Sequence, residues 1–125
     1  WVPQSRSAEV RREDLVKVPE LKILASSPEA GIYAVKTDHC RQVFLTGHAE
    51  YDRDTLAREY WRDRSAGTEI QLPRHYFPGD DPTREPVVRW RSCAHLLYSN
   101  WLNYCVYQTT PYDLTGISAG VRTED

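Results

Sequence analysis

The sequence has no methionine and only three cysteines, at positions 40, 93 and 105. An odd number of cysteines without Cys-x-x-Cys spacing argues against a disulfide framework and against a zinc knuckle. No second cluster of Cys, His and Asp stands at ligand spacing, so we expect no metal site. Because free thiols suit a reducing compartment, the sequence favours a cytoplasmic protein.

Long apolar runs and one-sided charge are also missing. No apolar segment approaches the roughly 18 residues that a membrane-spanning helix needs, and we see no signal peptide. The 16 Lys and Arg nearly balance the 18 Asp and Glu, for a formal net charge of -2. We therefore expect neither nucleic acid nor a membrane as partner, while small anionic ligands stay open. The chain opens abruptly on Trp1-Val2-Pro3, which favours a piece of a longer polypeptide.

What is present fits one domain. The 125 residues, 40% hydrophobic and 27% charged, are enough for one ordinary core and too few for two. Residues 21–25, 31–36 and 41–46 read as strands with short turns between them, which favours an antiparallel arrangement. A short helical turn is predicted at 13–17, ended by Val18-Pro19.

A helix is predicted from residue 55 to about residue 64. Asp52 or Asp54 is a plausible N-cap, and Ser65-Ala66-Gly67 supplies the stop. The prolines of residues 68–85 leave no room for a further helix there.

The strongest periodic signal lies in residues 90–105. Its apolar side chains recur at helical spacing, which predicts a core face rather than a cofactor site. They are Trp90, Cys93, Ala94, Leu97, Trp101, Tyr104 and Cys105.

The chain is organised around the stretch from Val43 to Asp52. Its apolar start reads as a buried strand, and Gly47 marks the point where the backbone leaves the sheet. His48 then stands at a strand end with Glu50 two positions on, where extended backbone points both side chains the same way. A carboxylate that holds one imidazole nitrogen fixes the tautomer, so the pair suits an oriented general base. The alternative is a strand-end His beside a solvated Glu.

A second candidate group lies on the helix that follows. Thr55, Glu59 and Arg62 are spaced four and three apart and share a face. Arg holds a carboxylate by two parallel hydrogen bonds and Glu accepts from an ammonium, so this face suits an amino acid. The alternative is an exposed ion pair between Glu59 and Arg62 that contributes little energy.

Other polar residues are expected to have plainer roles. We predict that His39, His75 and His95 are surface or packing residues and that Asp80-Asp81 belongs to a turn.

Several longer motifs carry a resemblance to a known family. They run in order from residue 5 to residue 114: Ser5-Arg6, Thr46-Gly47-His48-Ala49-Glu50-Tyr51, Thr55-Leu56, Glu59-Tyr60-Trp61-Arg62-Asp63, Tyr76-Phe77-Pro78, Asp80-Asp81-Pro82, Leu96-Leu97, Ser99-Asn100-Trp101-Leu102-Asn103-Tyr104 and Val106-Tyr107-Gln108. This order resembles the C-terminal half of the homoserine O-succinyltransferase and homoserine O-acetyltransferase family.

The resemblance implies an α/β fold, the C-terminal portion of a class I glutamine amidotransferase-like (flavodoxin-like) three-layer sandwich. Residues 1–114 would form this portion and residues 115–125 a mobile tail. The implied activity is acyl transfer from succinyl-CoA or acetyl-CoA to L-homoserine in methionine biosynthesis. No bound cofactor is implied, acyl-CoA being a co-substrate, and a homodimer is a reasonable expectation.

The resemblance also assigns residues. His48 and Glu50 match the catalytic His and Glu of a Cys-His-Glu triad, Arg62 matches the substrate-binding arginine, and Ser5 matches the serine that influences substrate choice. Glu59, in the same matched helix as Arg62, is a further candidate. The family's nucleophilic cysteine belongs to an N-terminal half that this chain does not contain. Its own cysteines read as one turn residue and two inert thiols on a buried helix face.

Two positions depart from the family pattern. Gln4 stands where the loop usually has His, which bears on substrate preference. Cys93-Ala94-His95 stands where a His, a small residue and an Asn are expected, which bears on packing under the site.

Two other functions fit the same residues. A glutamine amidotransferase-like hydrolase of the same fold would also use Cys, His and Glu. A non-catalytic interaction module is the second, because no nucleophile is present; the aromatic helix would then expose an apolar face and need a partner.

Overall fold

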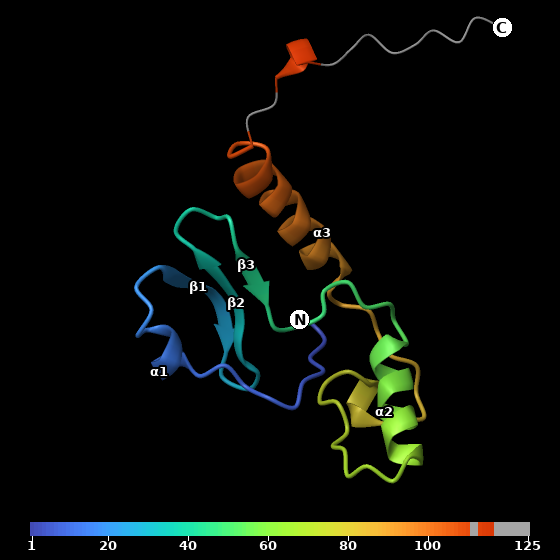
Figure 1. The fold of residues 1–125 in the computed structure, drawn as a ribbon. Helices are drawn as coiled ribbons and strands as arrows, with labels where there is room; N and C mark the ends of the chain where they lie inside the picture. Colours follow the sequence, from blue (N-terminus) through green and yellow to red (C-terminus); the bar gives the residue numbers. More distant parts are fainter. Residues whose placement is uncertain (111–112, 117–125) are drawn as a thin grey trace, which may run out of the picture.

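The computed structural model describes residues 1–110 and 113–116, which form a small α/β unit (Figure 1). The elements in chain order are α1 (Arg12–Leu15), β1 (Leu21–Ser27), β2 (Gly31–Thr37), β3 (Val43–Leu45), α2 (Thr55–Ser65), the 3-10 helix η1 (Pro78–Asp80), α3 (Arg91–Asn100), the π-helix η2 (Trp101–Val106) and the 3-10 helix η3 (Leu114–Gly116). The predicted tail begins inside η3, and from residue 117 onward it lies outside the described residues.

The sheet has three antiparallel strands in the order β1-β2-β3, which confirms the predicted arrangement. Leu21 pairs with Thr37 at one end of the first ladder, and Ala34 pairs with Leu45 in the second. The third strand is shorter than predicted. Residue 42 still belongs to the turn, because the Thr37 N–H donates to the Gln42 carbonyl at 3.0 Å.

The central strand β2 carries the buried part of the sheet. Ile32, Ala34 and Val35 are each exposed by less than a twentieth of their surface. Because neighbouring residues of a strand face opposite sides, burial of both Ala34 and Val35 means that β2 is covered on both faces at this point.

The helix α2 and the loop after it build a second, aromatic core. Leu56 and Tyr60 are the buried residues of α2; they are four residues apart and therefore lie on one face of the helix. Leu56 packs with Tyr76, Phe77 and Trp90 in one cluster. The loop that was predicted to lack helix contains one 3-10 turn, η1, because Pro78 presets the first residue of that turn.

The ends of α2 are set by local backbone geometry. Asp54 takes the N-cap position but makes no capping hydrogen bond; its carboxylate lies 3.3 Å from the Arg58 Nε instead. The predicted stop is confirmed at Gly67, whose φ of 78° is a left-handed conformation that glycine adopts without strain.

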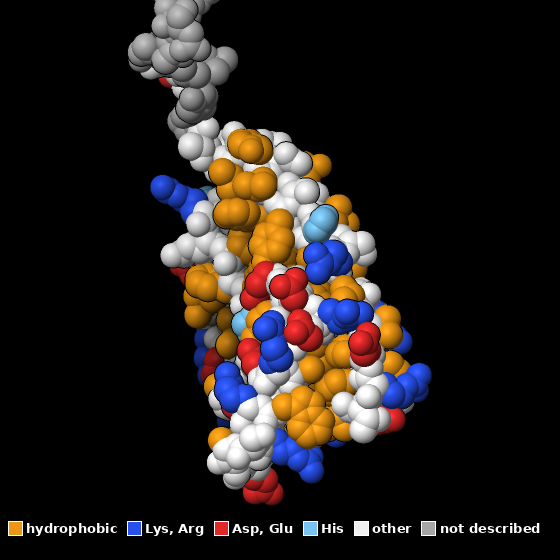
Figure 2. Space-filling model, turned by 90° about the vertical axis from the view of Figure 1, so that its right-hand side faces the viewer, with side chains coloured by type: hydrophobic (Ala, Val, Ile, Leu, Met, Phe, Trp, Pro, Cys, Tyr) orange, Lys and Arg blue, Asp and Glu red, His pale blue; other side chains and the backbone are white. Residues whose placement is uncertain are grey.

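The predicted second helix is present as α3 and η2, but its apolar stripe is mostly uncovered. Trp90 and Ala94 are buried, whereas Cys93 is exposed and Trp101 and Tyr104 keep 41% and 64% of their surface. The interpretation of the whole stripe as a core face was therefore wrong for this chain. Figure 2 shows these hydrophobic side chains of α3 and η2 as a column directly below the grey residues. We call the exposed large hydrophobic side chains of α3, of η2 and of the residue after η2 the aromatic ridge; they are Leu96, Tyr98, Trp101, Leu102, Tyr104 and Tyr107.

Among the described residues, no helix is both long enough and apolar enough to cross a lipid bilayer.

Candidate active site

The site begins at the corner where β3 leaves the sheet. The Thr46 N–H donates to the Tyr33 carbonyl at 2.9 Å, and the Thr46 hydroxyl donates to the Ile32 carbonyl at 2.6 Å. The next residue is pressed by the N-terminal segment: a Cβ on Gly47 would lie 2.2 Å from the Gln4 Nε2 and 3.0 Å from the Pro3 carbonyl oxygen. A side chain at this position fits only if Gln4 moves aside, so the corner favours glycine.

The same segment fixes the backbone of His48. Its N–H donates to the Pro3 carbonyl at 2.8 Å. Arg6 secures the segment by donating to the Ile32 carbonyl at 3.1 Å, to the Thr46 hydroxyl at 2.7 Å and to the Ala30 carbonyl. His48 therefore stands on a backbone held by both the sheet and the N-terminal segment.

The predicted His48 and Glu50 pair is present. The His48 Nδ1 lies 2.7 Å from the Glu50 Oε1. The local reason differs from the one predicted, since these residues form a turn in which the Tyr51 N–H donates to the His48 carbonyl at 3.4 Å, rather than extended backbone. Within the described residues, no hydrogen bond involves the His48 Nε2, and the imidazole side chain keeps 34% of its surface.

The charge state of Glu50 follows from this geometry. Partial burial raises the pKa of its carboxyl, but the His48 hydrogen bond, a backbone N–H and the charge of His48 outweigh burial and hold the pKa below its usual value. Glu50 is thus an ionised acceptor at neutral pH, which favours the His48 tautomer with a proton on Nδ1 and leaves Nε2 free to accept.

Tyr51 links His48 to the next helix. Its ring stacks on the imidazole with a centroid distance of 4.3 Å and an interplanar angle of 15°. Its hydroxyl donates to the Glu59 Oε1 at 2.7 Å, and its carbonyl accepts from the Trp90 Nε1 at 2.9 Å. Burial and the Glu59 carboxylate raise the pKa of Tyr51 to about 12, although a hydrogen bond with Ser5 acts in the opposite direction.

Glu59 and Arg62 of α2 both lie near Tyr51, but their side chains have different partners. Glu59 turns toward Tyr51, and its second oxygen, Oε2, is buried without a hydrogen-bond partner among the described residues. Arg62 keeps 69% of its side-chain surface and donates to Asp63 at 2.6 Å. The alternative of an exposed Glu59–Arg62 ion pair does not apply, because each side chain has another partner.

The five predicted site residues thus divide into two groups. In the first group, His48 and Glu59 contact Tyr51, Glu50 contacts His48, and Ser5 lies near enough to the Tyr51 hydroxyl to lower its pKa. Arg62 lies near enough to Glu59 and Tyr51 for their negative charge to raise its pKa, after the larger effect of Asp63. It stands at the solvent side of the group rather than inside it.

A small cavity opens beside this group. Its volume is about 210 Å³, and its walls come from the His48 corner and from α3. The lining residues are Ala49, Glu50, Tyr51, Trp90, Arg91, Ala94, His95 and Tyr98. One of the two positions that depart from the family pattern, His95, therefore stands in a wall shared with Glu50.

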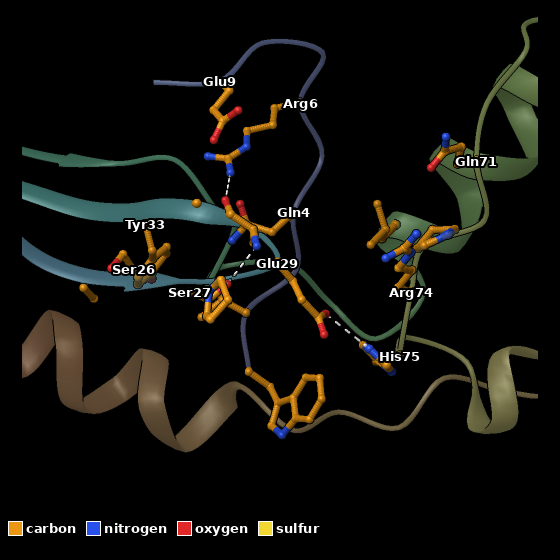
Figure 3. A pocket seen from close by; sticks show the side chains of 18 of the residues that line it. Gln4, Arg6, Glu9, Ser26, Ser27, Glu29, Tyr33, Gln71, Arg74 and His75 are labelled. Carbon is orange, nitrogen blue, oxygen red and sulfur yellow. Dashed lines mark hydrogen bonds and ion pairs between the residues drawn. The ribbon is translucent and has the colours of Figure 1, made fainter. Parts of the chain in front are cut away.

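A larger cavity of about 1060 Å³ lies elsewhere (Figure 3). It is enclosed by the N-terminal segment, the β1–β2 turn and residues 71–75, and the Glu29–His75 ion pair at 3.3 Å joins two of these walls. Neither His48 nor Glu50 lines it, so its size alone does not make it the catalytic site.

The remaining histidines and the acidic pair behave as predicted. His39, His75 and His95 are exposed, and Asp81 accepts from the Thr83 N–H and hydroxyl within a turn. In the described part of the chain, no group of three or more His, Cys, Asp or Glu side chains is placed to hold a metal ion.

The cysteines partly contradict the prediction. Cys93 is exposed and Cys105 only half-buried, so these are not two buried thiols on a core face. Cys40 lies in the β2–β3 turn as expected, where the Lys36 ammonium donates to its sulfur at 3.0 Å. Lys36 and Cys105 lower the pKa of the Cys40 thiol. No hydrogen bond joins any of these sulfurs to His48 within the described ranges.

Sequence reasoning missed Tyr51 and Trp90 as parts of the site. Tyr51 directly follows the His-x-Glu pair, but only the stack on His48 reveals its role. Trp90 was assigned to the core, correctly, and the sequence carries no signal that its indole would hold the Tyr51 backbone.

Comparisons with known proteins agree on one family. A family model described as homoserine O-succinyltransferase matches residues 1–112. Similar curated proteins are each named homoserine O-acetyltransferase: one from Clostridium novyi, 58% identical over 90% of this chain, one from Thermotoga petrophila, 56% identical over 94%, and one from Acetivibrio thermocellus, 60% identical over 91%. The matched regions cover 37%, 38% and 37% of these relatives, so the chain spans less than two fifths of their length.

Proposed function

The chain belongs to the homoserine O-succinyltransferase family, and from this premise we propose that it supplies the acid–base and amino-acid-binding part of a homoserine O-acyltransferase. The observation that carries the proposal is the 2.7 Å contact between the His48 Nδ1 and the Glu50 Oε1. It leaves Nε2 as the proton acceptor of an oriented imidazole.

The proposed reaction is a double displacement. A cysteine thiol from the part of the protein outside this chain gives its proton to the His48 Nε2 and attacks the thioester of an acyl-CoA. The bond between the acyl carbon and the CoA sulfur breaks, CoA takes the proton, and an acyl-cysteine thioester remains. The homoserine hydroxyl then gives its proton to Nε2 and attacks this thioester, which forms the O-acyl ester and returns the cysteine.

The other site residues would bind homoserine. Arg62, exposed and oriented by Asp63, would hold the substrate carboxylate, and the Glu59 carboxylate, whose Oε2 has no partner among the described residues, would accept from its ammonium. Ser5, beside the Tyr51 hydroxyl, would influence which substrate fits. Holding both ends of the amino acid would orient its hydroxyl toward the acyl carbon.

The larger protein follows from the same proposal. Residues 1–114 would be the C-terminal portion of a class I glutamine amidotransferase-like sandwich. The part of the protein that corresponds to the rest of the relatives' length would supply the cysteine. A bound cofactor is not required, since acyl-CoA is consumed as a substrate. A homodimer, a cytoplasmic location and a place in methionine biosynthesis stay predictions. The donor is left to experiment, because the family description names succinyl transfer and the similar proteins are named for acetyl transfer.

The test uses the complete protein that contains this chain. It is incubated with acetyl-CoA or succinyl-CoA, with and without homoserine, and separately with glutamine, and mass spectrometry follows the acyl-enzyme and the products. We expect O-acyl-homoserine from one donor and no glutamate. Glutamate without acyl transfer would favour the amidotransferase-like hydrolase, and no product in any arm would favour a non-catalytic module.

Variants test the residue roles. His48→Ala should abolish acyl-enzyme formation, whereas His39→Ala, an exposed histidine in the β2–β3 turn, should leave it unchanged. Arg62→Ala should raise the homoserine KM while acylation by acyl-CoA alone stays near the wild-type rate. An Arg62→Ala protein that binds homoserine normally and fails to acylate would contradict the assigned role.

A further inference from the structure

Tyr51 makes more specific contacts than packing alone requires. One face of its ring lies on the His48 imidazole, its hydroxyl donates to Glu59, and its carbonyl accepts from Trp90. Trp90 is 4% exposed and belongs to the aromatic core cluster, against which Tyr51 also packs. The Trp90 bond and the packing against the core cluster therefore hold Tyr51 on one side. Its ring and its hydroxyl contact two different site residues, His48 and Glu59.

The stack restricts how the His48 ring can turn. The Glu50 contact fixes one imidazole atom, Nδ1, and a single hydrogen bond still permits rotation about its own direction. A parallel ring at a centroid distance of 4.3 Å fixes the plane of the imidazole as well. Together the two contacts determine where Nε2 points.

The hydroxyl acts on the other side of Tyr51. By occupying the Glu59 Oε1, it leaves Oε2 as the oxygen without a partner among the described residues; this oxygen is enclosed, so a ligand ammonium reaches it only after neighbouring atoms move. A buried carboxylate oxygen without a partner costs free energy that an incoming ammonium would recover. The same donor prevents the carboxylate from turning away from the site.

We propose that Tyr51 is a positioning residue that joins the two halves of the reaction, because its ring sets the plane of the His48 imidazole and its hydroxyl aims Glu59 at the substrate ammonium. The inference rests on the proposed function for its kinetic consequences. The two effects belong to different atoms of one side chain, so two substitutions separate them.

The first substitution, Tyr51→Phe, keeps the ring and removes the hydroxyl. In the complete protein we expect acylation by acyl-CoA alone to stay within about twofold of wild type, while the homoserine KM rises about tenfold, the scale of one hydrogen bond to a charged group. The second, Tyr51→Leu, removes the ring as well. We expect it to slow acylation about a hundredfold, the scale on which misplacing a catalytic group lowers a rate.

A double-mutant cycle connects Tyr51 to Glu59. Glu59→Gln should raise the homoserine KM by itself, and combining it with Tyr51→Phe should raise KM by less than the product of the two single effects, since both act through one carboxylate. Tyr104→Phe is the matched control: Tyr104 is exposed on η2, lines neither cavity, and its hydroxyl makes no hydrogen bond among the described residues.

An NMR comparison tests the stack without reference to the reaction. In the complete protein with selectively labelled histidine, the His48 ring protons should lie upfield because they face the Tyr51 ring. The shift should persist in Tyr51→Phe and be lost in Tyr51→Leu.

The outcomes divide clearly. Equal effects of Tyr51→Phe and Tyr51→Leu on acylation, or an unchanged homoserine KM in Tyr51→Phe, would overturn the positioning role. So would His48 signals that do not respond to Tyr51→Leu. A wild-type complete protein that forms no acyl-enzyme would refute the proposed function and with it the coupling to the substrate, and the NMR comparison would then decide the stack alone.

Discussion

Replacing Gly47 by alanine tests whether the N-terminal segment sets the shape of the His48 corner. The new Cβ would meet the Gln4 Nε2 at 2.2 Å, the Gln4 Cδ at 2.9 Å and the Pro3 carbonyl oxygen at 3.0 Å. The first two atoms end a flexible side chain, which is able to swing away. The third is backbone, and it also accepts from the His48 N–H at 2.8 Å.

The magnitude follows from which atoms are able to move. Overpacking a filled site typically costs about 1–3 kcal/mol. Because Gln4 moves and Pro3 has only a few tenths of an ångström to give, we expect Gly47→Ala to destabilise the chain by about 1 kcal/mol, near the lower limit. For a domain of this size that loss lowers Tm by roughly 3–6 °C. Gly47→Val should cost about 3 kcal/mol, since two further methyl groups must fit.

Urea unfolding followed by circular dichroism measures these differences, and two further variants identify their source. With Gln4→Ala in the background, Gly47→Ala should cost less, and the cost that remains belongs to the Pro3 carbonyl. Gly116→Ala is the control, because no atom of the described residues lies within 4 Å of its Cβ position, and it should stay within about 0.5 kcal/mol of wild type. An equally stable Gly47→Ala protein, or a cost independent of Gln4, would refute the idea that residues 3 and 4 press on the corner.

Three further predictions concern charge. The pKa of the Glu50 carboxyl is lowered in the folded chain, so the ionised carboxylate stabilises the fold above the unfolded-state pKa, and this stabilisation is lost as pH falls through the folded-state pKa. Glu50→Gln should therefore be less stable than wild type at pH 7, by no more than about 1 kcal/mol because the pair is exposed, and as stable as wild type at pH 2. Urea unfolding at the two pH values measures the difference. Because Lys36 lowers the pKa of Cys40 and Cys40 raises the pKa of Cys105, iodoacetamide at pH 7 should modify Cys40 before Cys105, an order that peptide mapping detects and that Lys36→Met should weaken. Arg6→Met removes the donor to three oxygen atoms and should cost about 2–3 kcal/mol in urea unfolding, with Arg6→Lys recovering less than half, because an ammonium cannot reproduce the forked geometry.

Local pattern predicted the elements of this chain well. Strand and helix signals depend on neighbouring residues, so the sheet order and the α2 bounds of Thr55–Ser65 lay close to expectation. Short turns left little choice of topology. The His48–Glu50 contact was also anticipated, but through extended backbone, whereas the structure achieves it in a turn.

Contacts between distant residues were harder to predict. The spacing of Thr55, Glu59 and Arg62 places them on one helix face, yet it does not reveal that Tyr51 binds Glu59 while Asp63 binds Arg62. The prediction from the apolar stripe of α3 and η2 was limited in the same way. Periodicity shows that a face avoids water, and it does not show whether the cover comes from the same 125 residues.

The aromatic ridge gives the protein an optical reporter. Indole emission moves to shorter wavelength when its surroundings exclude water. Trp101 lies on the ridge with 41% of its surface open, Trp1 and Trp61 are exposed away from the ridge, and the core indole of Trp90 is already shielded. A polypeptide that covers η2 should therefore shift the Trp101 part of the emission to shorter wavelength, and replacing Trp101 by Phe should remove that shift.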